Sequence, residues 1–230
     1  MIYITGDTHA DLNRFYSPAA KKIKRGDTLI VCGDFGFIWD GGDEELKILK
    51  KLSKLKYDIL FVDGKHENFD ILNKYPVVEY AKGKTHKIAE NIYHLIRGNV
   101  FNIEDKTIFA LGGGESTDKE DRKAADKWWS EEMPNIEEMK YAVSNLNKYD
   151  RTVDYIITHE PPTASRNILV SSLVNFNMLD VFLDEIAKQV KYKKWFFGCL
   201  HIDRKITSMS YAVFKDIIPI EEVQSKRKFR

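Results

Sequence analysis

Four of the six histidines in this 230-residue chain directly follow short apolar runs, each beside a glycine or an acidic residue. These four are His9, His66, His159 and His201. Imidazole nitrogens and carboxylate oxygens suit divalent cations such as Zn, Fe or Mn, and ligands of open α/β sheets sit at the ends of buried strands. The pattern therefore predicts a metal site. His86 and His94 lack this setting, and we interpret them as ordinary surface or edge-strand residues.

The spacing of the acidic residues supports a metal site. One residue separates Asp7 from His9, so in an extended segment both side chains point to the same side. Asp34 follows the next apolar run and has two oxygens that can bridge two cations. His159 and His201 add neutral nitrogen ligands. Two cations about 4 Å apart would hold a hydroxide and clamp an in-line displacement at phosphorus.

The elements that must position these residues alternate between strand-like and helix-like patterns. Unbroken apolar runs predict strands buried on both faces at residues 2–4, 28–32, 59–62, 107–111, 153–158 and 194–197. Apolar stripes predict helices at residues 46–55, 136–146 and 179–190. Residues 205–220 alternate as an antiparallel hairpin does. We expect a single α/β domain over residues 1–220, followed by a basic, solvated tail at 221–230.

Composition excludes several classes of protein. Lys and Arg total 36 against 35 Asp and Glu, which gives no basic footprint for nucleic acid, so we expect no nucleic-acid partner. The two cysteines, Cys32 and Cys199, exclude a disulfide scaffold. No signal peptide or membrane-length apolar run is evident, so we expect a cytoplasmic protein without a membrane partner. Nothing in the sequence indicates the oligomeric state.

Five motifs in order resemble those of the calcineurin-like metallophosphoesterases. They are Gly6-Asp7-Thr8-His9, Gly33-Asp34, Gly64-Lys65-His66-Glu67, Thr158-His159 and Gly198-Cys199-Leu200-His201. The family pattern is Asp-x-His, Gly-Asp, Gly-Asn-His-Asp/Glu, His and Gly-His-x-His. The resemblance spans residues 6 to 201 and implies a four-layer αββα sandwich with the metals at one end.

The resemblance also implies roles for individual residues. Four side chains would bind the first metal: Asp7, His9, Asp34 and His201. Asp34 would bridge the first metal and the second. His159 would be a ligand of the second metal. His66 would stabilise the transition state or protonate the leaving oxygen.

Two positions depart from the family pattern. Lys65 stands where the family has a metal-binding Asn, and Cys199 stands where it has a metal-binding His. In one interpretation the Lys65 ammonium replaces the second cation and pairs with the phosphoryl oxygens. In another, Cys199 and His159 still hold a softer metal, such as Zn or Fe. A third is a weakened or inactive catalyst. We favour loss or weakening of the second metal site.

The motifs also bear on the substrate. Protein Ser/Thr phosphatases of the family carry arginines in the second and third motifs that are missing here, so we expect a small phosphomonoester, phosphodiester or nucleotide instead. Gly113 and Gly114 follow a strand and form either a phosphate-binding backbone nest or a simple turn. Arg122 lies in the next charged segment, which is either a rim that binds phosphate or a solvated loop.

The sequence as a whole predicts a metallophosphoesterase that hydrolyses phosphate esters with metal-activated water. It would hold one or two divalent ions (Mn, Fe or Zn) and have reduced activity if the second site is lost. The alternative is a catalytically impaired homologue that binds a phosphate or a nucleotide without turning it over.

Overall fold

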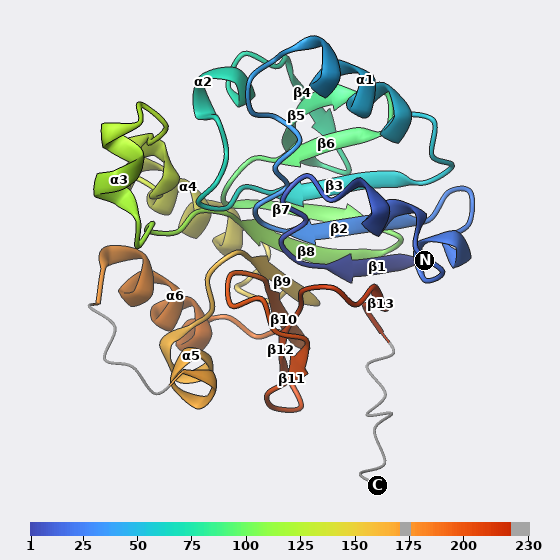
Figure 1. Ribbon diagram of the computed structural model, residues 1–230. Helices are drawn as coiled ribbons and strands as arrows, with labels where there is room; N and C mark the ends of the chain where they lie inside the picture. The colour runs from blue at the N-terminus through green and yellow to red at the C-terminus, as the bar shows by residue number, and fades with distance from the viewer. Residues whose placement is uncertain (171–175, 222–230) are drawn as a thin grey trace, which may run out of the picture.

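The computed structural model describes residues 1–170 and 176–221, which form two β-sheets with helices on their outer faces (Figure 1). The first sheet has seven strands in the order β13-β1-β2-β3-β6-β5-β4. Their bounds are β1 Ile2–Thr5, β2 Thr28–Cys32, β3 Asp58–Val62, β4 Val77–Tyr80, β5 Gly83–Ala89, β6 Ile92–Leu95 and β13 Ile218–Pro219. The strands β1, β2, β3 and β6 are parallel, and the outer strands pair antiparallel.

The second sheet has six strands in the order β11-β12-β10-β9-β8-β7. Their bounds are β7 Asn99–Ile103, β8 Lys106–Leu111, β9 Tyr155–Thr158, β10 Lys194–Phe197, β11 Arg204–Lys205 and β12 Ser210–Ala212. The strands β8, β9, β10 and β12 are parallel, whereas β7 and β11 are antiparallel edges. Both sheets therefore have a parallel centre, and the carboxyl ends of these central strands are where polar loops collect.

The helices are α1 Asp43–Leu52, α2 Phe69–Leu72, α3 Lys119–Ala124, α4 Ile136–Asn147, α5 Thr163–Leu169 and α6 Met178–Gln189. Three short 3₁₀ helices join them: η1 Leu12–Tyr16, η2 Ala20–Lys22 and η3 Ser130–Glu132. Asparagine capping boxes start the two long helices that cover the second sheet, at Asn135 for α4 and Asn177 for α6. The helices predicted from apolar stripes are therefore present, with shifted bounds.

The side chains of the central strands explain the layers. On β2, Leu29 packs on the helical side together with Leu52 of α1, whereas the next residue, Ile30, packs between the sheets. On β9, Ile157 packs between the sheets and Ile156 faces the α4 and α6 side. Because successive strand residues point to opposite faces, strands covered on both sides need continuous apolar runs. The predicted four-layer αββα sandwich is confirmed.

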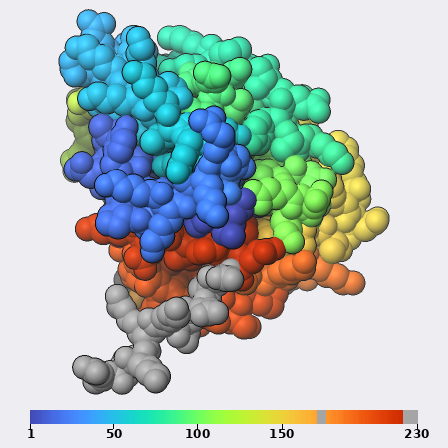
Figure 2. Space-filling model, turned by 90° about the vertical axis from the view of Figure 1, so that its right-hand side faces the viewer, coloured from blue at the N-terminus to red at the C-terminus, as the bar shows by residue number. Residues whose placement is uncertain are grey.

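The N-terminal and C-terminal parts of the described chain lie against each other. β13 pairs with β1, with Tyr3 opposite Pro219 and Ile4 opposite Ile218. In the side view, residues near the N-terminus lie directly above residues from the last fifth of the chain (Figure 2). The predicted hairpin at 205–220 is only partly correct, because β11 and β12 form a hairpin but β13 joins the other sheet. The predicted basic tail at 221–230 lies outside the described residues apart from residue 221.

Two histidine predictions are wrong. His86 on β5 and His94 on β6 are neighbouring buried residues, with 9% and 5% of their surface exposed, rather than surface residues. The antiparallel strands that bury them, at residues 77–103, were not identified from the sequence, because they are short and carry many polar residues. Within the described residues, no helix is long and apolar enough to cross a membrane.

Candidate metal centre

The candidate site is built from loops that leave five parallel strands at the same edge. β1, β2 and β3 lead into Asp7, Asp34 and Lys65, and β9 and β10 lead into His159 and Cys199. Parallel strands place these loops together because their carboxyl ends share one edge of each sheet. All eight residues that the motifs assigned to metal binding or catalysis lie in these loops: Asp7, His9, Asp34, Lys65, His66, His159, Cys199 and His201.

The backbone of the site is strained. Five of its residues have positive φ angles: Asp7 at 31°, His9 at 42°, Asp34 at 44°, Cys199 at 59° and His201 at 51°. Such conformations cost about 1–3 kcal/mol each for residues other than glycine and persist where the surroundings fix them. The tight turns aim side chains from different strands at one point.

Two glycines let the loops approach closely enough. A Cβ on Gly64 would lie 2.0 Å from Asp34 Oδ1. A Cβ on Gly33 would lie 2.1 Å from His159 Nδ1, and Gly33 also has a φ of 96°. Neither position has room for a side chain, so the glycines in the Gly-Asp and Gly-Lys-His motifs are required by packing.

One half of the site gathers two buried carboxylates and the imidazoles around them. His201 Nε2 lies 3.5 Å from Asp7 Oδ2, and His9 Nε2 lies 3.7 Å from Asp34 Oδ2. The Nε2 atoms of His9 and His201 are 3.0 Å apart. Asp7 and Asp34 are almost fully buried, at 1% and 2% exposure. These four side chains form a compact set of nitrogen and oxygen donors, which we call the first position.

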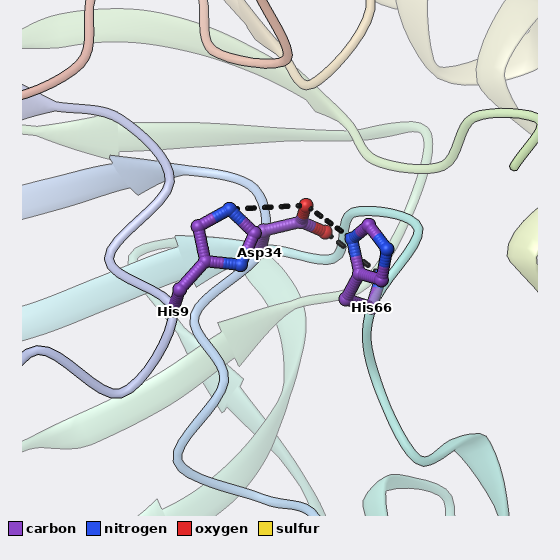
Figure 3. A group of neighbouring side chains, drawn as sticks. All are labelled: His9, Asp34 and His66. Carbon is purple, nitrogen blue, oxygen red and sulfur yellow. Dashed lines mark hydrogen bonds and ion pairs between the residues drawn. The ribbon is translucent and has the colours of Figure 1, made fainter. Parts of the chain in front are cut away.

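Asp34 also holds His66 in place (Figure 3). The backbone N–H of His66 donates to Asp34 Oδ1 at 2.8 Å, and its ring Nδ1 lies 2.8 Å from Asp34 Oδ2. Burial opposes ionisation of Asp34, but the nearby His159 and the bonds from His66 outweigh it and hold the pKa of this carboxyl well below its usual range. Asp34 is therefore an ionised carboxylate shared among several imidazoles.

His159 is oriented with its second nitrogen free. Its Nδ1 lies 3.3 Å from both the carbonyl oxygen of Cys32 and Asp7 Oδ1, two acceptors that favour a proton on Nδ1, and Nε2 then carries the lone pair in the neutral ring. Burial alone would lower the pKa of His159, but the carboxylates of Asp34 and Asp7 raise it to about 9. The same negative field favours a metal cation at this point.

The buried polar atoms provide a test of whether a cation fits. Asp7 Oδ1, Asp7 Oδ2 and His159 Nε2 are buried and have no hydrogen-bond partner in the described chain. An unpaired buried carboxylate is costly, and buried polar groups in native proteins are almost always satisfied. Three groups can each offer ligand atoms within 4.8 Å of one another: Asp7, Asp34 and His159; His9, Asp34 and His66; and His159, Glu160 and Cys199. The donor set therefore fits a divalent cation.

A lysine occupies the other half of the site, which we call the second position. Lys65 Nζ donates to Glu160 Oε1 at 3.0 Å and lies 3.2 Å from Cys199 Sγ. Burial lowers the pKa of Lys65, but the carboxylate of Glu160 outweighs burial and raises it above the ordinary value. Burial, together with Glu160, raises the pKa of the Cys199 thiol. The second position thus holds an ammonium beside a neutral thiol.

Glu160 is a buried acidic residue of this half that the motifs did not single out. Its Oε2 accepts from Arg166 at 3.1 Å, and Arg166 pairs with Asp180 at 2.6 Å. Burial raises the pKa of Glu160, but Lys65 and other nearby positive groups lower it overall, so it is ionised. The signal in the sequence was its position directly after His159, in a loop that already carried a ligand.

The residues assigned to substrate binding lie nearby but have other partners. Arg122 is 8% exposed and donates to the carbonyl oxygen of Lys65 at 2.9 Å. It also lies 3.3 Å from Glu132. The N–H groups of Gly113 and Gly114, which a phosphate nest needs, each donate to a backbone carbonyl at 2.9 Å. In this structure Arg122 supports the loop of Lys65, and the two glycine N–H groups are already bonded.

The fold and the site together define a four-layer αββα protein with candidate metal ligands, histidines and carboxylates, at the carboxyl ends of its parallel strands. The sequence matches the model of the calcineurin-like phosphoesterases over residues 1–203. Because this match covers most of the chain, the protein belongs to the calcineurin-like phosphoesterase family.

Individual relatives are distant. A search of curated proteins found no match. Among solved structures, the fold is similar to a candidate 5'-nucleotidase from Staphylococcus aureus in complex with α-ketoglutarate, with a TM-score of 0.46 and 14% identity over 93% of this chain. This chain covers 48% of that protein. It is also similar to the phosphopantetheinyl hydrolase of Mycobacterium tuberculosis, with a TM-score of 0.43, 14% identity, and coverage of 93% of this chain and 89% of that one.

Proposed function

We propose that this protein hydrolyses a small phosphomonoester, phosphodiester or nucleotide with one divalent cation at the first position, held by Asp7, His9, Asp34 and His201. The observation that carries the proposal is that Asp7 Oδ1, Asp7 Oδ2 and His159 Nε2 are buried without a hydrogen bond. The groups nearest the Asp7 oxygens are imidazoles, those of His159 at 3.3 Å and His201 at 3.5 Å. These atoms need a cation for their burial to be favourable. His159 supplies the nitrogen nearest the boundary between the two positions.

A bound divalent cation polarises a phosphoryl oxygen and lowers the pKa of water, which is the chemistry that the chain itself lacks. His66 is the proposed acid. Its Nδ1 is held by Asp34, so its Nε2 is the atom left to face a substrate and to give a proton to a leaving oxygen. The ring is 39% exposed, as a group that meets a substrate must be.

Lys65 is the proposed replacement for the second cation. Its ammonium has three N–H donors, and the described chain binds it through Glu160 and Cys199 only, which leaves one donor for a phosphoryl oxygen. Glu160 keeps the ammonium charged because it stabilises that form. A fixed positive charge aimed where negative charge develops stabilises the transition state.

The same contact supports the second candidate function. A lysine locked between Glu160 and Cys199 gives less charge than a metal, so an impaired phosphoesterase that binds a phosphate or nucleotide without turnover is the alternative. The two candidates share the first position and differ in the rate of the chemical step.

One experiment tests both. The purified chain is loaded with manganese, its metal content is measured, and turnover of an aryl phosphate and an aryl phosphodiester is followed. We expect about one tightly bound ion per chain and measurable hydrolysis. Two ions at full occupancy would contradict the role of Lys65. Tight binding of inorganic phosphate with no turnover of either ester would favour the binding module.

A further inference from the structure

A pocket of about 390 Å³ lies behind the end of β3, outside the metal centre. It is walled by Phe69 of α2, by β5 and β6, and by the segment that runs from η3 into α4. Its exposed lining residues, through which it opens to solvent, are Asn73, Ser130, Glu131 and Asn135. The volume is in the range of sites that hold small organic molecules. None of the proposed metal ligands lines it.

A chain of buried polar side chains forms the floor of this pocket. His94 Nε2 lies 3.0 Å from Asp63 Oδ1, and His94 Nδ1 lies 3.0 Å from His86 Nδ1. Arg97 Nε donates to Asp63 Oδ2 at 2.9 Å. Burial opposes ionisation of Asp63, but Arg97 and His94 hold its pKa well below the usual range, so it is a carboxylate. The hydrogen-bonded series therefore begins at the ionised carboxylate of Asp63, whose charge is balanced by Arg97.

The hydrogen bonds define which atom of His86 faces outward. Asp63 accepts the Nε2 proton of His94, and we assign the pair with both rings neutral, in which case Nδ1 of His94 accepts from His86 Nδ1. The second nitrogen of His86, Nε2, is then an acceptor, and within the described chain no residue donates to it. His86 is only 9% exposed and lines the pocket. This nitrogen lines the pocket and can accept a hydrogen bond from a ligand that enters it.

The rest of the lining favours the same kind of ligand. Glu131 and Glu138 add carboxylates, and Phe69 and Met133 add apolar surface. The N-terminus of α4 offers no anion site, because Asn135 and Glu138 form a capping box. The one cation, Arg97, is bound to Asp63, Glu138 and backbone carbonyls. The pocket combines acceptors with flat apolar walls.

We propose that this pocket is a second binding site, which takes a small planar molecule that carries an amidinium or exocyclic amino group. The amino group donates to His86 Nε2 and to the carboxylate of Glu131, and the ring packs against Phe69 and Met133. The site is independent of the phosphoester chemistry, because its lining residues and the proposed metal ligands are different side chains.

Benzamidine is the probe, and benzoate, which has the same shape and the opposite charge, is its control. Each is titrated into the full chain while binding is measured by calorimetry and the imidazole signals of His86 and His94 are followed by NMR. We expect benzamidine to bind and to shift the His86 signals, and benzoate not to bind. Equal binding of the two, or no binding of benzamidine at about 10 mM, would overturn the proposal.

Two variants locate the site. His86→Phe keeps a ring but removes the acceptor, and Glu131→Gln removes an exposed charge without risk to the core. Each should weaken benzamidine binding about tenfold, as expected for a lost hydrogen bond to a charged group. Glu137→Gln, on the exposed side of α4 beside Lys140, is the matched control and should change nothing. Unchanged affinity in Glu131→Gln, or equal loss in Glu137→Gln, would contradict the placement.

Discussion

The two positions of the candidate metal centre differ in the groups that surround their buried carboxylates. At the first position, the carboxylate of Asp7 is buried with no hydrogen-bond partner. At the second, the carboxylate of Glu160 is buried and has two cationic partners from the chain itself, Lys65 and Arg166. In the proposed function, the first position takes a cation from outside, whereas the second has the ammonium of Lys65.

This difference suggests a way in which a lysine can take the place of a metal ligand without loss of the fold, which we propose for the second position. Lys65 brings its charge to the second position together with Glu160, so the burial of both is compensated. Asp7 and His159 keep atoms without partners, which is the mark of a position still able to bind an ion. We therefore expect the number of ions per chain to depend on Lys65 more than on the number of donors.

Removing the shared carboxylate of the first position should have the largest effect. Asp34→Asn takes away the charge near three imidazoles, those of His9, His66 and His159. We expect tight metal binding to be lost and hydrolysis of an aryl phosphodiester to fall by at least about 100-fold. Glu131→Gln, on the exposed rim of the other pocket, is the control for charge removal. Full activity in Asp34→Asn would break the comparison between the two positions.

Restoring the family pattern should allow the second position to bind a metal ion, as proposed for the first position. The double variant Lys65→Asn and Cys199→His removes the ammonium and adds an imidazole. The metal content should rise from about one to about two ions per chain, and turnover should rise about tenfold. Metal analysis and steady-state kinetics measure both. If the ion count rises and activity does not, Lys65 is as effective as the second cation; if neither rises, Lys65 is not what excludes it.

Two glycines distinguish the effect of tight packing against His159 from the effect of a positive φ alone. Gly33 and Gly26 both have positive φ, but an added Cβ would meet His159 at 2.1 Å only at Gly33, with nothing within 4 Å at Gly26. Gly33→Ala should cost more than about 3 kcal/mol of the free energy of unfolding. Gly26→Ala should cost about 1 kcal/mol. Urea denaturation measures both, and equal losses would show that contact with His159 is unimportant.

A histidine outside both positions, His86, should make a small contribution to the loss of stability at acidic pH. Burial and His94 lower the pKa of His86 to about 4 in the folded protein, against about 6.5 in an unfolded chain. The unfolded state therefore takes up the proton first, so stability is lost as the pH falls from about 6.5 to 4. His86→Phe should lack this component, which we expect to reach about 2 kcal/mol by pH 5. Parallel stability curves for the two proteins across that range would contradict the shift.

Much of the fold followed from local pattern. The continuous apolar run at residues 28–32 requires cover on both faces, and β2 has it. The apolar stripe of residues 179–190 matches α6, whose capping box begins at Asn177. The strands at 77–103 did not follow, because β4 alternates between exposed and partly exposed residues and its pairing depends on β5. Short edge strands are defined by their partners more than by their own residues.

The sequence by itself determined the chemical types at the site and their order along the chain, because those residues directly follow strands that are recognisable from local hydrophobicity. Only the tertiary structure decided which atoms remain without partners. Lys65 meets Glu160 across 95 residues of sequence and Cys199 across 134, and Arg122 is used by the loop of Lys65. Such contacts depend on how the two sheets pack, which no local pattern encodes. The physical reason is that a buried charge is stabilised by whichever group the fold brings within about 3 Å of it.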